Sequence, residues 1–371
     1  MAYTTIDDGS AHFEVTIWTG TGGARTISGL NHKPDLIWTK TRSVGYNHMW
    51  SDSSRGFNAN SELGSNSTAA EGGLSAETYG YKSGHTSDGW TLVDGTDTVD
   101  SQEDGNTNQP SVTYVGWTWA ANGGTTTTND ASATSVGSID SVYQANTTAG
   151  FSIVTYTGTG SNGTIAHGLG STPKWYFVKN RSESSVSSTD QAWIVYHSVM
   201  GHGAAMFLNT TDSKMNHSPF WNSTAPTSTT FSVGTDSRTN TSADNYIAYC
   251  FSEVQGYSKF GSYKGNGNAD GPFVYTGFKP AFMIAKEYGA SRNWTMADSL
   301  SQTAGNGGVT NSQQPNVAGA KDANERMDWL SNGFKIRNTS TTWNTSGGTF
   351  IYIAFAEHPF VSSKGIPTTA R

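Results

Sequence analysis

Six acidic residues are candidates for the paired carboxylates of a glycosidase. Such an enzyme places two carboxyl groups across a cleft, one as the general acid and the other as nucleophile or base. The candidates are Asp52, Glu62, Glu71, Asp88, Asp298 and Glu357. Asp52 and Asp298 hold the same place in an internal repeat, but the middle copy has His197 there. A polar residue that ends a strand and bonds a nearby turn explains this position. We therefore predict no catalytic residue, with an active site confined to one copy as the alternative.

The nine histidines do not have the spacing of a metal site. His197 and His202 are five residues apart, and Gly203 follows, so that no strand or helix face aligns the two rings. Four others lie in Gly-, Ser- and Asn-rich turns, where we expect surface histidines: His32, His85, His167 and His217. Cys250 is the only cysteine, which excludes an internal disulfide and a Cys-based zinc site. We predict no metal and no cofactor.

Four aromatic residues in polar loops are candidates for sugar contact. Trp221, Trp343, Tyr79 and Tyr81 are surrounded by Ser, Thr, Asn and Gly. Loops carried on a rigid scaffold are common recognition sites, and an exposed ring can stack on a sugar. The alternative is that these rings cover the bases of their own loops.

The composition points to a β-rich protein with an aromatic core. Charged residues make up 14% of the 371 residues, well below the ~25% of an average globular protein. The chain has 12 Trp, 16 Tyr and 16 Phe, and each buried ring removes roughly 150–250 Å² from water. The 43 glycines, together with many Ser, Thr and Asn, suit turns between short strands. This composition excludes a helical bundle, a coiled coil and a membrane protein.

The charge pattern limits the partners. The formal net charge is −7 and no basic cluster occurs, so we predict no nucleic-acid binding, which requires concentrated Lys and Arg. No apolar run approaches the ~18 residues of a transmembrane helix, so we predict no membrane insertion. Residues 1–8 carry neither a basic nor an apolar segment, and we expect no secretory signal peptide. A large β protein without disulfides is expected to fold in a reducing cytoplasm.

Short sequence blocks recur three times in the same order. The most regular block is an apolar run that begins with Pro and ends six residues later with Lys, as in Pro34–Lys40, Pro173–Lys179 and Pro280–Lys286. Each copy closes with an aromatic strand: Tyr114–Trp119, Tyr246–Phe251 and Tyr352–Phe355. Repeats of this length, about 100 residues, are typical of tandem domains rather than of a solenoid.

These repeats predict the domain organisation. We expect an N-terminal arm (1–11), a first unit (12–121), a Gly/Thr/Ser-rich linker (122–150), a second unit (151–255), a third unit (259–360) and a C-terminal tail (361–371). The linker composition is typical of flexible or extended coil.

Within each unit the pattern predicts short strands bounded by turns. The fold class is therefore all-β, with three tandem homologous β-sandwich domains of jelly-roll or concanavalin-like type. Residues 320–330 are the best candidate for a short helix. Trp38, Phe177 and Ile284 each follow their proline by four residues, and we expect all three to point into the cores of their own sandwiches.

Several segments of the first unit resemble a repeat found in virion structural proteins of tailed phages, especially marine phages and cyanophages. The segments are Ala2–Asp8, Thr19–Gly22, Lys33–Lys40, Asp52–Gly56 and Asn66–Glu71, and the resemblance extends over all three units. It implies a concanavalin-like or tail-associated fold without a settled activity. The second and third units lack the Asp-Ser-x-Arg-Gly segment around Arg55, so a role for that arginine does not extend to them.

The resemblance implies a non-enzymatic protein on the particle surface, assembled in the host cytoplasm and located in the virion. Either a tail-associated, receptor-binding component or a capsid decoration fits a compact three-unit chain. The expected partners are other virion proteins, further copies of the chain in a homo-oligomer and a host surface glycan. The alternative function is that of a carbohydrate-binding module or polysaccharide depolymerase.

Overall fold

The computed structural model describes residues 4–97, 105–182, 191–302, 308–309, 311–323 and 326–357. This part of the chain is all-β, and its sheets are antiparallel. The helices are short: α1 Ala76–Tyr79, α2 Ala131–Thr134, α3 Ser237–Asn240, α4 Thr341–Asn344 and the single 3-10 turns η1 Gly9–Ala11, η2 Ala59–Ser61 and η4 Ser218–Phe220. The helix expected over 320–330 is wrong, because residues 327–330 form a strand that pairs on both sides.

The first unit has two sheets. The inner sheet has the order β1-β7-β3-β4, with the bounds β1 Phe13–Thr19, β7 Thr113–Trp119, β3 Leu36–Thr41 and β4 Met49–Asp52. The outer sheet has the order β2-β6-β5, with the bounds β2 Arg25–Ser28, β6 Gly89–Val93 and β5 Tyr81–Thr86. Buried residues of both sheets, among them Ile27, Ile37 and Trp90, form one apolar cluster between the two layers.

The second unit has a longer inner sheet, ordered β15-β14-β13-β12-β17-β10-β9-β8. Its bounds are β15 Met215–Asn216, β14 Ala204–Phe207, β13 Trp193–His197, β12 Trp175–Asn180, β17 Asn245–Phe251, β10 Phe151–Thr157, β9 Ser141–Asn146 and β8 Thr127–Asn129. The outer layer is the pair β11 Gly163–Ala166 and β16 Thr230–Val233.

The third unit has two four-stranded sheets. The inner one has the order β18-β25-β20-β21, with the bounds β18 Ser258–Lys264, β25 Thr349–Ala356, β20 Pro280–Glu287 and β21 Thr295–Asp298. The outer one has the order β19-β24-β23-β22, with the bounds β19 Phe273–Tyr275, β24 Gly333–Ile336, β23 Met327–Leu330 and β22 Gly308–Val309.

The three inner sheets have the same strand order and the same register. Four strands are common to all three, in the orders β1-β7-β3-β4, β10-β17-β12-β13 and β18-β25-β20-β21, and the strand that contains the Pro-to-Lys run is the third of these four: β3, β12 and β20. Residues at the same offset have equivalent partners on the closing strand, since Trp38 pairs with Trp117, Phe177 with Tyr249 and Ile284 with Ile353. The constant interval in the sequence therefore corresponds to a constant position in the sheet.

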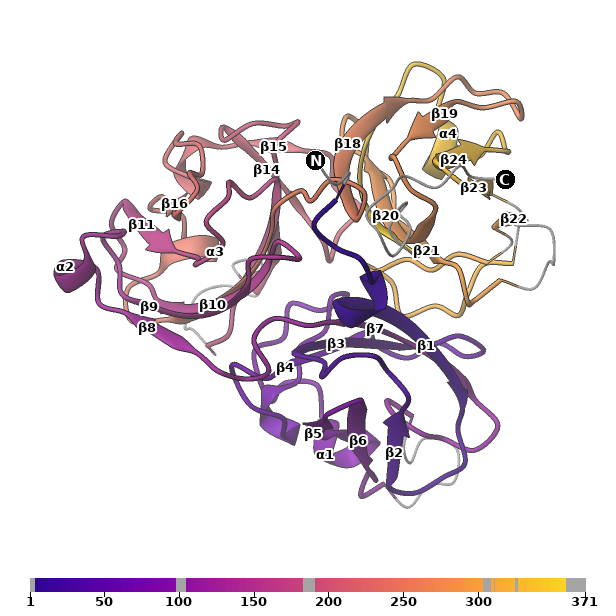
Figure 1. Ribbon diagram of the computed structural model, residues 1–371, viewed down its shortest axis with the longest axis horizontal. Helices are drawn as coiled ribbons and strands as arrows, with labels where there is room; N and C mark the ends of the chain where they lie inside the picture. Colours follow the sequence, from indigo (N-terminus) through magenta and orange to yellow (C-terminus); the bar gives the residue numbers. More distant parts are fainter. Residues whose placement is uncertain are drawn as a thin grey trace.

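The three inner sheets also share one apolar core at the centre of the molecule. Figure 1 shows the units as three lobes around this centre. Trp119, Phe251 and Phe355 occupy equivalent sheet positions, and their ring centroids lie 6.2, 5.7 and 5.8 Å apart pairwise. Because one face of each inner sheet meets this core and the other meets its own outer sheet, alternate residues on both faces are buried.

This arrangement corrects the expected orientation of Trp38, Phe177 and Ile284. All three are buried, but they belong to the shared central core. In the first two units it is their neighbours, such as Ile37 and Tyr176, that face the unit's own outer sheet. Strand alternation accounts for this difference, because a shift of one residue moves a side chain to the other face.

The expected linker at 122–150 is likewise corrected. It contains β8, α2 and β9, and β9 pairs along its whole length with β10 of the second unit. Asp130 caps α2 by accepting hydrogen bonds from the backbone of Ser132 and Ala133. Polar side chains that bond locally, together with a free sheet edge at β10, give this apparently coil-like segment a regular structure.

The expected N-terminal arm packs on the body of the chain at residues 4–11, where Ile6 is buried in the central core. The expected C-terminal tail, 361–371, lies outside the described residues.

Candidate functional site

Two of the four aromatic residues predicted to contact sugar are not free to do so. Trp221 and Trp343 are completely buried, and the indole N–H of Trp221 donates to the carbonyl oxygen of Ala204 at 3.0 Å. Tyr79 and Tyr81 are half-buried, and Tyr81 packs against an apolar cluster. A stacking platform needs an exposed ring face, so the two tryptophans are corrected to core residues of their units. The polar loop sequences around them concealed this role.

The two repeated aspartates are buried and already bonded. Asp52 accepts from the Nε of Arg55 at 2.6 Å and from the hydroxyl of Tyr249 at 2.7 Å. Asp298 accepts from the backbone and hydroxyl of Ser301 and from the indole N–H of Trp117 at 3.2 Å. Burial raises the pKa of the Asp298 carboxyl.

The repeated position is Asp52, His197 and Asp298 in the three units. Which residue occurs there follows from the group of another unit that lies against it. Tyr249 of the second unit reaches Asp52 of the first, and Trp117 of the first unit reaches Asp298 of the third. The equivalent residue of the third unit is Ile353, which has no donor. Its partner position is His197, whose Nε2 lies 3.4 Å from the carbonyl oxygen of Tyr352. An aspartate occurs where a side-chain donor faces it, and a histidine where only backbone does.

The remaining candidate carboxylates also have partners. Glu62 is buried with Lys82, at 3.1 Å from its Nζ, and Glu357 pairs with Lys279. Asp88 accepts from the hydroxyl of Thr86 at 3.2 Å. Each of the six carboxylates thus accepts a hydrogen bond or forms an ion pair within the described structure.

Arg55 and Glu71 are the centre of a charged cluster that spans two units. The buried Arg55 guanidinium contacts Asp52, the backbone of Ser61 and, at 2.6 Å, Glu71. Arg181 of the second unit holds Glu71 through two hydrogen bonds of 2.8 and 2.9 Å. Burial disfavours the Arg55 charge, but Asp52 and Glu71 hold its pKa well above the usual value. The Asp-Ser-x-Arg-Gly segment, present only in the first unit, thus joins the first two units.

The lysine that ends each Pro-to-Lys run is buried and reaches into another unit. Lys179 donates to the carbonyl oxygen of Thr68 at 3.0 Å, from the second unit to the first. Lys286 donates to Thr211 at 2.8 Å, from the third unit to the second. Lys40 donates to Ala318 at 3.0 Å, from the first unit to the third. The three contacts therefore close a ring.

A second set of contacts repeats in the same direction. The indole N–H of Trp193 donates to Gly64 at 2.7 Å, and that of Trp294 donates to Phe207 at 2.8 Å. His48 holds the equivalent position, with its Nε2 3.0 Å from the carbonyl oxygen of Gln314. Within each unit an asparagine side chain accepts from the backbone of these ring residues: Asn66, Asn209 and Asn316.

Sequence reasoning identified the lysine position but not these contacts. The three asparagines that fix the contacting loops follow the ring residue by 18, 16 and 22 residues, so no constant spacing marked them in the sequence. Which unit each side chain reaches is decided by the arrangement of the three sheets, which no local pattern contains.

The histidines form no metal centre. Among the described residues, no three His, Cys, Asp or Glu side chains lie close enough to hold a metal ion. The expectation of surface histidines is wrong for His32 and His167, which are buried and contact backbone carbonyl oxygens of Ser10 and Thr227. Burial lowers the pKa of both imidazoles to about 4.

Two surface hollows accompany these contacts. One has a volume of about 240 Å³ and is polar: its lining is Thr128, Asp140, Ser141, Val142, Thr155, Tyr156, Thr157, Arg181 and Asn245. The other, of about 300 Å³, lies where the first two units meet: its lining is Thr68, Ala192, Phe207, Asn209, Thr210, Asp212, Met215 and Arg238. Arg181 and Thr68 already take part in the contacts between units.

The fold and these contacts define an all-β protein in which three inner sheets close around one aromatic core. The chain belongs to the family of the domain of unknown function DUF7483, which matches residues 8–359. The family match spans all three units, in agreement with a core that they build together. No curated protein and no solved structure matches the chain. Among the described residues, no helix has the length and apolar character needed to cross a membrane.

Proposed function

We propose that this chain is a non-enzymatic structural protein on the surface of a phage particle. The observation that carries the proposal is that the polar side chains of the repeated positions make hydrogen bonds between units. The aspartates, lysines and ring nitrogens that could do chemistry are bound in contacts that join the three units. The resemblance of the first unit to virion structural repeats supports the same function.

We further propose that the three units are tandem β-sandwich domains of jelly-roll or concanavalin-like type. In the first two units an inner sheet and an outer sheet enclose a separate apolar cluster, as sandwich layers do. In the third unit the corresponding residues merge with the central core.

The location is that of a tail-associated, receptor-binding component or a capsid decoration. Virion surface proteins take the symmetry of their attachment site, so we expect a homo-oligomer on the particle, with other virion proteins as partners. A host glycan bound weakly by each copy would gain from this multivalency.

The proposal is tested on purified particles of the phage that encodes the chain. Mass spectrometry should find the chain as a stoichiometric component, and gold-labelled antibody should decorate intact particles at the tail or over the capsid. Absence of the chain from purified particles would overturn the proposal.

The alternative, a polysaccharide depolymerase, is tested by turnover. We expect no release of reducing sugar from host polysaccharide by the purified chain. Hydrolysis that Asp52→Asn or Asp298→Asn abolishes, in variants whose unfolding midpoint shows them to be folded, would favour the enzyme.

A further inference from the structure

The outer sheet of the third unit carries two exposed aromatic residues on one strand. Phe273 is 46% exposed and Tyr275 is 59% exposed, while Val274 between them is 7% exposed and belongs to the core. Alternation along β19 therefore directs both rings to the outer face of the sheet. They are the aromatic members of the exposed large hydrophobic residues among the described residues.

The other two units show that the sheet does not need these rings. Val274 pairs with Phe334, as Ile27 pairs with Trp90 and Ile165 with Phe231. The positions equivalent to Phe273 and Tyr275 are accordingly Thr26 and Ser28 in the first unit, and Thr164 and Ala166 in the second. Small or polar residues serve the same strand there, so the aromatic pair is a property of the third unit alone.

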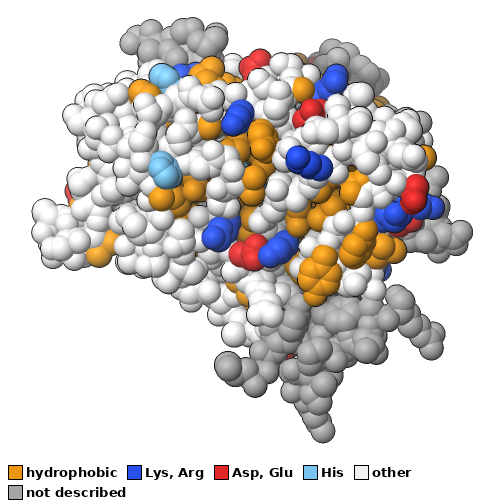
Figure 2. All heavy atoms as spheres, turned by 90° about the horizontal axis from the view of Figure 1, so that it is seen from above, with side chains coloured by type: hydrophobic (Ala, Val, Ile, Leu, Met, Phe, Trp, Pro, Cys, Tyr) orange, Lys and Arg blue, Asp and Glu red, His pale blue; other side chains and the backbone are white. Residues whose placement is uncertain are grey.

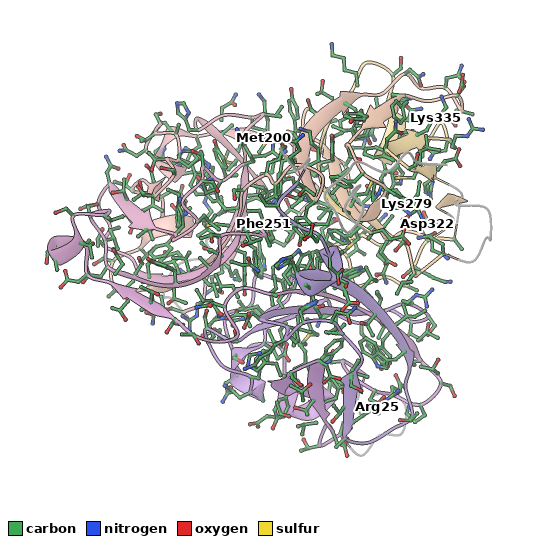
Figure 3. The ribbon with its side chains drawn as sticks, viewed as in Figure 1. Arg25, Met200, Phe251, Lys279, Asp322 and Lys335 are labelled. Carbon is green, nitrogen blue, oxygen red and sulfur yellow. The ribbon has the colours of Figure 1, made fainter. Side chains whose placement is uncertain are left out.

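The neighbouring strand, β24, places a glycine and a charged side chain beside the two rings. Gly333 lies opposite Tyr275, and a Cβ atom at this glycine would be 3.1 Å from Cε2 of the Phe273 ring. Lys335 lies opposite Phe273, and its Nζ is 2.8 Å from a carboxylate oxygen of Asp270. Arg337 pairs with Asp328 at 3.2 Å. Figure 3 shows Lys335 in the lobe formed by the third unit, away from the centre of the molecule.

Two adjacent rings with a charged margin suit a small amphiphilic ligand better than a protein. A stable protein interface covers about 800 Å² on each partner, which is several times the area of two half-exposed rings. On the face drawn in Figure 2, hydrophobic side chains likewise occur in limited areas with charged groups among them. A pyranose has C–H groups that can cover the negative face of an aromatic ring and hydroxyls that can bond charged groups at the margin.

We propose that Phe273 and Tyr275 form a stacking platform for the pyranose rings of a neutral glycan, with Lys335 and Asp270 bonding its hydroxyls. This inference deepens the proposed function and rests on it only for the source of the glycan, a host surface. It replaces Trp221 and Trp343 with residues whose rings are accessible.

The test uses the full chain and a variant designed from its own sequence. Phe273→Thr combined with Tyr275→Ser gives β19 the residues that the first unit carries at these positions, so the fold should persist. Ile17→Thr is the matched control, because Ile17 is 43% exposed on a strand of another unit. Cellotetraose, maltotetraose and the tetramer of N-acetylglucosamine are titrated at millimolar concentration. The resonances of the sugar report binding to every protein by NMR, and the ring resonances of Phe273 and Tyr275 are followed in the parent chain and in Ile17→Thr.

We expect saturable shifts of both ring resonances with at least one tetrasaccharide. The double variant should bind at least ~10-fold more weakly, whereas Ile17→Thr should bind as the parent chain does. No ring shift with any of the three sugars, or equal binding by the double variant, would overturn the inference. The proposed function is tested separately, by the protein composition of the particles. The sugar titration can therefore fail while the proposed function holds, and the reverse.

Discussion

Three lysines at the same place in the repeat have pKa values that burial lowers. Burial lowers the pKa of Lys40 and Lys179 from 10.5 to about 7 and that of Lys286 to about 8. Their Nζ atoms contact hydroxyl or backbone carbonyl oxygens, and a neutral amine retains the N–H donors for such bonds. The lysines therefore join units through these hydrogen bonds, and Glu71 near Lys179 and Asp212 and Glu287 near Lys286 only partly offset the effect of burial.

This arrangement predicts that the free energy of unfolding rises between pH 7 and pH 9.5. In that range the unfolded chain keeps its lysines protonated while the folded chain releases protons, and stability rises wherever the unfolded state binds more protons. Each lysine contributes at most about 1.4 kcal/mol per pH unit. Above pH 10 the trend should reverse, because burial raises the pKa of Tyr196 and Tyr246 to about 12. Urea unfolding at a series of pH values measures the slope.

Lys179→Met is the control for that slope. It keeps the length of the side chain and removes the titrating group, so the variant should show a flatter pH dependence than the parent chain. An identical slope in parent and variant would exclude Lys179 as a source.

The Asp/His alternation gives a second prediction at this scale. His197→Asp places a carboxylate in a buried position that Ile353 faces without a donor. The backbone N–H of Val199, which donates to His197 Nδ1 at 3.0 Å, could bond this carboxylate, but no side-chain donor would. An unpaired buried charge costs about 3–5 kcal/mol, so we expect a loss of up to this size in the free energy of unfolding, measured with urea.

Adding Ile353→Tyr to His197→Asp should restore part of the loss, because the pair would then resemble Asp52 and Tyr249. The single variant Ile353→Tyr controls for the added volume. The loss in the free energy of unfolding of the double variant is compared with the sum of the losses of the two single variants. If it were not smaller than that sum, donor matching would not explain the alternation.

At the scale of elements, residues 127–146 show how a coil-like composition can extend a sheet. β9 lies between β8 and β10 and is paired on both sides. Its Gln144 donates to the hydroxyls of Ser53 and Ser54 in the first unit, at 2.8 and 2.6 Å. The segment thus belongs to the second unit and also touches the first.

We therefore predict slow amide hydrogen exchange in β9. A flexible linker would exchange at the rate of an unstructured chain. Hydrogen-bonded amides of a strand that lies between two others exchange only after local or global opening. Mass-spectrometric exchange of peptides that cover residues 141–146 gives the measurement. Exchange as fast as in a denatured control would show that the segment is not held in the sheet.

The sequence predicted those features that are local and repeated. The Pro-to-Lys runs marked equivalent strands because strand period and turn chemistry act over a few residues. The same pattern misplaced Trp38, because an inner strand buried on both faces does not alternate between apolar and polar residues. Trp221 and Trp343 were misplaced for a related reason, since the sheets that bury them are distant in sequence. The platform at Phe273 was missed because exposure, like burial, is a tertiary property.

At the scale of the whole molecule, the units are not independently packed domains. Trp50 of the first unit packs on Phe177, Trp193 and Tyr249 of the second, with ring centroids 5.0–5.6 Å apart. Phe282 of the third unit contacts Trp119 of the first. Each interface thus buries rings that a separated unit would expose to water.

The last prediction is that the three units unfold in a single cooperative transition. Aromatic rings bury roughly 150–250 Å² each, and loss of one unit would expose core rings of the other two, so partial unfolding costs nearly as much as complete unfolding. Calorimetry should give one peak whose van't Hoff and calorimetric enthalpies agree. Trp38→Ala should cost about 3–5 kcal/mol and lower the midpoint of that one peak without splitting it. The excised first unit, residues 12–121, should aggregate or remain unfolded because its central face is uncovered. Three resolved peaks, or a stable soluble first unit, would instead show independent domains and remove the shared core as the source of rigidity.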